Sequence, residues 1–143
     1  IIIFGFVLRQ IGFFLFLDID DFKRVNDAHG HHIGDLVIQH ISALLRESSV
    51  SSKMISRWGG EEFLVVVKHA SNADCKALCD RIVQRCREQP FVYKDLQFPV
   101  NVSMGAATFE QLELRHYKAL IQKVDKNLYE AKARGKNQYV FSA

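Results

Sequence analysis

The run GFFLFL at residues 12–17 restricts the fold most, because every residue after Gly12 is Phe or Leu. The carboxylates Asp18, Asp20 and Asp21 follow at once. A short, continuously apolar run that ends in charged residues is typical of a strand buried on both faces in the middle of a sheet. The sequence therefore predicts a central strand with a group of acidic side chains at its end.

Strand-like and helical patterns follow one another along the rest of the chain. Two short apolar runs, residues 54–58 and 63–67, flank Gly59 and Gly60 and predict a hairpin. Further strands are expected at residues 91–93, 98–108 and, at the edge of the sheet, 139–141. Helices are expected at residues 22–28 and 73–88. Another helix is expected to start at Asp35, a plausible N-cap, and the last to run from residue 114 to Gly135, a plausible C-cap.

This order of elements defines a mixed α/β (α+β) chain. The expected architecture is one central, mostly antiparallel sheet flanked by helices. A length of 143 residues suits a single domain, which we assign to residues 1–143. The 19 basic and 16 acidic residues leave a net charge of +3, and this excess is too small to indicate a nucleic-acid partner.

The N-terminal run is apolar but is interrupted by Arg9 and Gln10. A membrane-spanning helix needs about 20 apolar residues, so we expect no membrane contact by this domain. No basic start or small-residue cleavage site indicates a signal peptide. We therefore expect a truncated or incomplete N-terminus, and a membrane tether elsewhere in the full-length protein stays open.

The three cysteines, Cys75, Cys79 and Cys86, fall in one predicted helix. An odd, clustered set favours a reducing compartment, the cytoplasm, over a disulfide framework. Cys75 and Cys79 are one turn apart, so a metal site is an alternative. We favour buried core thiols, because the apolar residues Leu78 and Ile82 lie on the same stripe.

Two groups of carboxylates indicate metal chemistry. Asp18, Asp20 and Asp21 end the first strand, while Glu61 and Glu62 follow the glycine pair of the hairpin. Mg²⁺ in proteins is usually held by one or two carboxylates together with substrate phosphates. Either group alone is better explained as the solvated rim of a loop. Their joint placement at strand ends favours a metal site.

The glycine pair Gly59-Gly60 permits positive φ angles and lets a ligand approach the backbone. The simpler explanation is a two-residue hairpin turn, for which Gly-Gly is a common solution.

The segment FKRVNDAHGHHIGD, residues 22–35, gathers polar groups that can bind a base. The segment offers Lys23, Asn26, Asp27, His31 and Asp35, and an Asn and an Asp can together recognise guanine by hydrogen bonds. Alternatively, Asn26 and Asp27 close a helix. Lys132 and Lys136 are four residues apart and can face phosphates together, although lysines at a helix end are usually solvated.

Four ordered segments, residues 17–35, 57–63, 100–107 and 125–137, together resemble the GGDEF family, the diguanylate cyclases of bacterial signalling. The signature stands here as GGEEF. The resemblance implies a fold like the palm of nucleotidyl cyclases and polymerases. It implies Mg²⁺-dependent condensation of two GTP into cyclic di-GMP and two pyrophosphates by a homodimer. It also implies an upstream sensor or receiver domain in the full-length protein.

The resemblance assigns roles to the site residues. Asp18, the carbonyl of Ile19 and Glu61 match the ligands of two Mg²⁺ ions, for which Mn²⁺ is an alternative. Glu61 is also the residue proposed to help deprotonate the 3′-hydroxyl, and Glu62 matches the fourth position, which is also important for activity. The remaining matches are residues that bind the nucleotide. The guanine is expected to be bound by Asn26 and Asp35. The phosphates are expected to be bound by Asp21, Phe22, Lys23, Lys132 and Lys136, and space for the nucleotide is expected at Gly59 and Gly60.

The chain departs from the family pattern at three points. Lys136 replaces the usual Arg, which implies slightly weaker phosphate binding. The inhibitory RxxD site is replaced by VSSK at residues 50–53, so we expect no product inhibition there. Only 17 residues precede Asp18, so the upstream DxLTxLxNR-like turn is missing, in keeping with a truncated N-terminus. A non-catalytic GTP-binding or dimerising module, and an interaction domain without ligand, are the alternatives to a cyclase.

Overall fold

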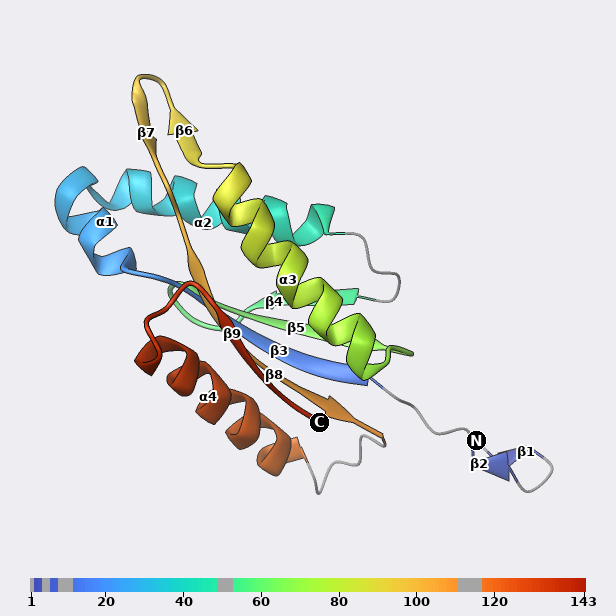
Figure 1. Ribbon diagram of the computed structural model, residues 1–143. Coiled ribbons are helices and arrows are strands. Elements are labelled where there is room, and N and C mark those ends of the chain that lie inside the picture. The colour runs from blue at the N-terminus through green and yellow to red at the C-terminus, as the bar shows by residue number, and fades with distance from the viewer. Residues whose placement is uncertain (1, 4–5, 8–11, 49–52, 111–116) are drawn as a thin grey trace.

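The computed structural model describes residues 2–3, 6–7, 12–48, 53–110 and 117–143 (Figure 1). A five-stranded sheet has the order β4-β5-β3-β8-β9. Its strands are β4 (Lys53–Arg57), β5 (Glu62–Lys68), β3 (Gly12–Ile19), β8 (Val102–Phe109) and β9 (Tyr139–Ser142). All neighbours are antiparallel except β8 and β9, which are parallel. The predicted α+β architecture and the edge position of the last strand are confirmed.

Helices cover both faces of this sheet. The described helices are α1 (Phe22–His29), α2 (His31–Glu47), α3 (Asn72–Glu88) and α4 (Tyr117–Ala133). In Figure 1, α2 and α3 lie on one face of the sheet and α4 lies on the other. Two small hairpins lie outside the sheet, β1 (Ile2–Ile3) with β2 (Phe6–Val7), and β6 (Phe91–Tyr93) with β7 (Leu96–Phe98).

The central strand β3 is buried along its whole length, as predicted. Alternate side chains of a strand point to opposite faces. Phe13, Leu15 and Leu17 therefore pack into the cluster that α2 and α3 share, whereas Phe14 and Phe16 pack against Val124 and Leu128 of α4. This double burial leaves the end of β3, with its carboxylates, as the place where the strand meets solvent and ligands.

Two local predictions are wrong. Asp35 is not a helix N-cap: α2 begins at His31, because Gly30, at φ 87°, ends α1 and lets the chain turn directly into the next helix. Residues 98–108 are not one strand, since β7 ends at Phe98 and β8 begins at Val102. Pro99 lies in the break, and a proline has no N–H to donate to a ladder.

The hairpin turn also differs from the two-residue form. The Trp58 N–H donates to the Glu62 carbonyl at 2.8 Å, so three residues, Gly59 to Glu61, form the loop. Neither glycine adopts a positive φ. The loop therefore does not need glycine for its backbone conformation. The reason for glycine at these positions has to be the space that a side chain would occupy.

The helix ends follow their sequence signals. Ser71 and Asp74 form a capping box at the start of α3. Gly135, at φ 117°, follows α4, and the Lys136 N–H donates to the Ala131 carbonyl at 3.1 Å. This is the predicted glycine C-cap. Residue 114, where that helix was expected to begin, lies outside the described residues.

The cysteine prediction is confirmed: Cys75, Cys79 and Cys86 are free and buried on the inner face of α3. Burial raises the pKa of the Cys86 thiol to about 11. None of the helices in the described ranges is long and apolar enough to cross a membrane.

Candidate active site

A cavity of about 220 Å³ opens at the end of β3 and gathers most of the predicted site residues. Its lining comes from the end of β3, the start of α1, the β4–β5 loop, the end of α4 and the turn after α4. The lining residues are Asp18, Ile19, Asp20, Asp21, Phe22, Lys23, Glu61, Lys132 and Lys136. The predicted metal ligands and the predicted phosphate-binding residues thus face one space.

Pairing of β3 with β5 places the two groups of carboxylates side by side. Asp18 lies opposite Glu62 in the antiparallel register, and the Ile19 N–H donates to the Glu61 carbonyl at 3.2 Å. The loop is held from the other side by Arg57, whose Nη2 donates to the Gly60 carbonyl at 2.7 Å. Arg57 stands within RWGGEEF, but its role was not predicted from the sequence.

Each carboxylate at the end of β3 contacts the segment that runs from the end of α4 to β9. Asp18 Oδ2 accepts from Lys132 Nζ. Asp21 Oδ1 accepts from Lys136 Nζ at 2.7 Å. Asp20 instead accepts from two uncharged donors, one of them in this segment. The free protein therefore neutralises its own acidic strand end with the lysines that were predicted to bind phosphates.

The electrostatics of Asp18 and Asp21 differ because of burial. Burial raises the pKa of Asp18, and the hydrogen bond from Lys132 offsets part of this effect. The pKa of Asp21 is lowered, chiefly by the hydrogen bond from Lys136. The side chain of Asp18 is 7% exposed and that of Asp21 is 47% exposed. Asp18 is thus the more costly of the two carboxylates to keep ionised.

Glu62 does not line the same cavity as Glu61. It borders a smaller space of about 40 Å³ with Phe16, Trp58 and Asp125. Its pKa is raised by burial first and by the charge of Asp18 second. Neighbouring residues on a chain near strand geometry point to opposite sides. The structure therefore separates the two glutamates of GGEEF, with Glu61 on the side of the residues predicted to bind metal and phosphates.

The two glycines of the loop have different surroundings. A Cβ atom on Gly59 would lie 3.2 Å from Glu62 Oε2, whereas one on Gly60 would meet nothing within 4 Å. Gly60 thus leaves open space beside Glu61, in line with the predicted room for a nucleotide.

Asn26 and Asp35, the predicted guanine-binding pair, lie on α1 and α2 outside the lining of this cavity. Asn26 Oδ1 is buried and has no hydrogen-bond partner among the described residues. A Cβ atom on Gly34 would lie 1.9 Å from that oxygen. Gly34 therefore makes the room that the Asn26 amide needs. A glycine inside an amphipathic helical pattern was the signal in the sequence, and its role was missed.

The donors in the cavity suit a hard divalent cation. Asp18, Glu61 and the backbone at Ile19 offer oxygen atoms only, which Mg²⁺ prefers. Within the described ranges, no three His, Cys, Asp or Glu side chains are grouped closely enough to enclose an ion. An ion held here would need oxygen atoms from a bound phosphate, which is the usual arrangement for Mg²⁺ at nucleotide sites.

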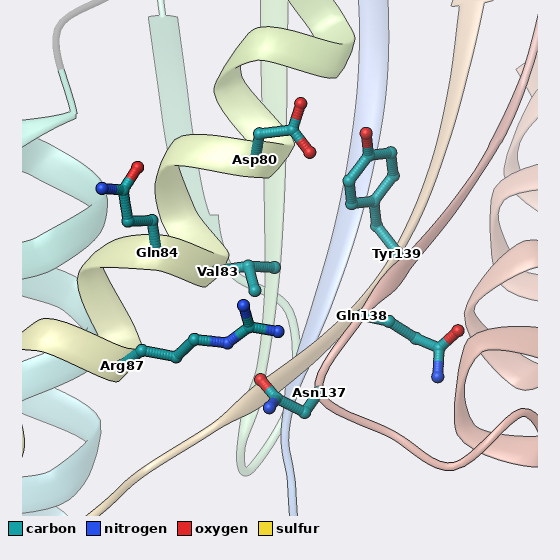
Figure 2. Close-up of a pocket in the computed structure, with 7 residues that line it drawn as sticks. All are labelled: Asp80, Val83, Gln84, Arg87, Asn137, Gln138 and Tyr139. Carbon is teal, nitrogen blue, oxygen red and sulfur yellow. The ribbon is translucent and has the colours of Figure 1, made fainter.

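A larger cavity, of about 410 Å³, lies between α3 and β9 (Figure 2). It is lined by Asp80, Val83, Gln84, Arg87, Asn137, Gln138 and Tyr139, none of which was predicted as a site residue. Asn137 separates it from the candidate site, because its backbone N–H donates to Asp20, which lines the other cavity.

The fold and the site together define a class of protein: an α+β domain that presents carboxylates and lysines at the end of a buried central strand. The model of the family "Diguanylate cyclase, GGDEF domain" matches residues 8–138. The chain therefore belongs to the GGDEF domain family of diguanylate cyclases.

Known relatives agree with this assignment. The chain is 31% identical over 128 residues to diguanylate cyclase A of Treponema denticola and 38% identical over 126 residues to diguanylate cyclase DgcS of Shewanella oneidensis. The matches cover 90% and 88% of this chain. They span 34% and 40% of the two relatives, so the chain is similar to less than half of each.

A solved structure, that of the active GGEEF domain of a diguanylate cyclase from Vibrio cholerae, has the same fold. The TM-score is 0.83 at 27% identity, and the match covers 94% of this chain and 84% of that one. The family and the fold predicted from the sequence are both confirmed.

Proposed function

We propose that this domain is a diguanylate cyclase, which joins two GTP molecules into cyclic di-GMP and releases two pyrophosphates. One observation carries the proposal: Asp18, Glu61, Lys132 and Lys136, from three separate parts of the chain, line one cavity. Carboxylates for a metal beside lysines for phosphates are the groups that phosphoryl transfer requires.

The residues act as follows in the proposed reaction. Lys132 and Lys136 exchange their partners Asp18 and Asp21 for the triphosphate, with Lys23 and the backbone at Asp21 and Phe22 beside them. Asn26 and Asp35 hold the guanine, so that the nucleotide is fixed at both ends. Fixing both ends orients the α-phosphate, and orientation of this kind supplies much of the rate gain in a displacement reaction.

Glu61 is proposed to accept the proton of the attacking 3′-hydroxyl, while Glu62 supports the loop from its other side. The 3′-oxygen of one GTP bonds to the α-phosphorus of the other, and the bond to the pyrophosphate leaving group breaks. Asp18, Glu61 and the Ile19 carbonyl would hold two Mg²⁺ ions, or Mn²⁺, which neutralise charge that develops on the phosphates. Gly59 and Gly60 leave space for the nucleotide.

We propose that the active species is a homodimer in which each domain presents one GTP. Each cavity has three lysines, Lys23, Lys132 and Lys136, beside the proposed metal ligands Asp18 and Glu61, and this set suits a single triphosphate. In the full-length protein a sensor or receiver domain would control this pairing, in the cytoplasm, where GTP is available. The rate per domain should then rise with protein concentration.

We also propose that the product does not inhibit through an RxxD site. Residues 50–52 of the corresponding stretch lie outside the described residues. Lys53, at the position of the family's Asp, donates to the carbonyls of Arg46 and Ser48 at the end of α2. A positively charged lysine that is hydrogen-bonded to the end of a helix cannot replace the carboxylate of the family's Asp.

The test is a turnover assay with GTP and Mg²⁺, in which cyclic di-GMP is measured across a range of protein concentrations. Glu61→Gln should abolish product formation while GTP still binds, because the amide keeps the shape of the side chain but neither accepts the proton nor carries the charge. Glu88→Gln, the same exchange at an exposed position of α3, is the matched control and should be fully active. Unchanged turnover by Glu61→Gln would contradict the proposed role.

A further inference from the structure

The carboxylate of Asp20 is bonded to two elements that are distant in the sequence. Oδ1 accepts from Ser103 Oγ of β8 at 2.6 Å, and Oδ2 accepts from the Asn137 backbone N–H at 2.9 Å. The Asp20 N–H donates to the Asn101 carbonyl at 2.9 Å. Asp20 therefore joins the end of β3 to the start of β8 and to the turn between α4 and β9.

The partners of Asp20 distinguish it from its two acidic neighbours. Asp18 and Asp21 are paired with lysine ammonium groups, which a triphosphate would attract. The donors to Asp20 are a hydroxyl and an amide, and neither carries a charge. Both oxygen atoms of Asp20 have a protein partner, so this carboxylate can keep its bonds when a nucleotide draws the lysines away.

The turn that Asp20 holds has an unfavourable backbone conformation. Gly135, Lys136 and Asn137 all have positive φ angles, of 117°, 65° and 50°. Lys136 and Asn137 have a Cβ atom, and such residues adopt this region only when surrounding contacts hold them there. The bond from the Asn137 N–H to Asp20 is one of those contacts, and it lies next to Lys136, which was predicted to bind phosphate.

The side chain of Asn137 does not take part in this bond. It lines the large cavity next to the Arg87 side chain, as Figure 2 shows, and its Oδ1 is buried with no partner in the described part of the chain. Asp20 thus holds the backbone of the turn, and removal of the Asn137 side chain leaves the bond in place.

We propose that Asp20 is a positioning residue: it fixes the turn at residues 135–137 in its left-handed conformation and so places Lys136 at the nucleotide phosphates. This inference rests on the proposed cyclase function, and it assigns Asp20 no role as a metal ligand. Asp20→Ala should therefore weaken GTP binding without changing the requirement for Mg²⁺.

The kinetic test compares Asp20→Ala with the conservative Asp20→Asn. A hydrogen bond to a charged group contributes enough that its loss changes affinity by about tenfold or more. We expect the KM for GTP to rise about tenfold in Asp20→Ala, with kcat and the Mg²⁺ concentration for half-maximal rate unchanged. Asp20→Asn should restore most of the affinity, because its amide can accept from Asn137 and donate to Ser103. Asn137→Gly is the matched control: glycine keeps the backbone N–H and adopts the left-handed conformation freely, so this variant should keep the wild-type KM.

A double-mutant cycle separates positioning from a general structural effect. If Asp20 acts through Lys136, then Asp20→Ala should add less than about twofold to the KM of Lys136→Ala. A further tenfold rise in that background, or a shift in the Mg²⁺ requirement, would overturn the proposal.

Hydrogen exchange gives a readout that does not need activity. The Asn137 amide should exchange at least about tenfold faster in Asp20→Ala than in the wild type, while the amides of β3 remain protected. If Asp20→Ala does not fold, Asp20→Ser, whose short side chain cannot reach both partners, takes its place. Unchanged exchange at Asn137 would refute this inference, whereas absence of cyclic di-GMP from the wild type would refute the proposed function alone.

Discussion

The two ends of the proposed nucleotide site differ in how they are prepared for a ligand. At the phosphate end, Asp18 and Asp21 are paired with Lys132 and Lys136. At the guanine end, Asn26 Oδ1 is buried and has no partner among the residues described.

The difference shows what binding has to change at each end. A triphosphate has to displace two ion pairs, but it brings its own charge, and a metal ion can take over the carboxylates that the lysines leave. A guanine has no such ion pair to break at Asn26, but the Asn26 side chain has to turn to expose its buried oxygen. Phosphate binding should therefore be sensitive to charge, and base binding should be sensitive to shape.

The largest expected effect comes from Asp18→Asn at the phosphate end. Loss of the carboxylate removes a proposed metal ligand and frees Lys132 to bind the phosphates without metal. Even supporting residues of metal sites cost 10- to 100-fold when they are replaced, so we expect turnover to fall by more than about 100-fold. GTP binding without Mg²⁺ should persist or strengthen, as measured by isothermal titration calorimetry. Turnover within a few-fold of the wild type would show that Asp18 holds no metal.

At the guanine end, Gly34→Ala should act through shape alone. The new Cβ atom would lie 1.9 Å from Asn26 Oδ1, so the Asn26 amide has to move. A well-made pair of hydrogen bonds to a base contributes about 1–3 kcal/mol, so the KM for GTP should rise about tenfold, and the preference for GTP over ATP should fall. The fold should tolerate the change, since Ala favours a helix more than Gly does. Gln39→Ala, at an exposed position of α2, is the control, and an unchanged nucleotide preference in Gly34→Ala would refute the role of Asn26.

The sequence predicts which residues lie at the two ends of the site, but not the contacts that make the two ends different. The buried strand, its acidic end and the glycine after α4 depend on local patterns, so they were predicted correctly. The wrong N-cap at Asp35 has a local cause as well: Gly30 lets two helices follow one another without a capping side chain. The pairs of Asp18 with Lys132 and Asp20 with Asn137 join residues more than 110 positions apart. No local pattern predicts which of three neighbouring acids meets which donor.

The pH dependence of stability should differ between Asp18 and Asp21. The pKa of Asp18 in the folded state is raised by burial, so its ionised form opposes folding, and this penalty disappears as pH falls through the folded pKa towards 3.8. The pKa of Asp21 is lowered by Lys136, so its contribution is present above 3.8 and is lost as pH falls through its folded pKa, below 3.8.

Urea unfolding from pH 3 to pH 7 can measure both effects. Asp18→Asn should gain stability relative to the wild type at neutral pH, and the gain should shrink as the pH falls. Asp21→Asn should lose a little stability at neutral pH and none at the acidic limit. Parallel curves for the two variants would contradict the difference in burial.

The smallest effect is expected for Lys136→Arg. The exchange keeps the positive charge and adds a planar fork that can donate two hydrogen bonds to a phosphate. Lys136 is 45% exposed and its partner Asp21 is 47% exposed, so the longer side chain has room. Arg also has a Cβ atom, and the strain at φ 65° is therefore the same in both proteins. We expect the KM for GTP to fall by about threefold, since one further hydrogen bond in solvent contributes only about 0.5–1.5 kcal/mol.

Lys132→Arg tests whether this gain belongs to the exposed pair only. Lys132 meets Asp18, whose side chain is 7% exposed, so a larger head group has to fit against a buried carboxylate. Core sites resist added volume, which forces neighbouring side chains out of their preferred rotamers. Lys132→Arg should therefore leave the KM unchanged or raise it, while Lys136→Arg lowers it. Equal gains at both positions would show that the two lysines meet the phosphates in the same way, despite their different surroundings in the free protein.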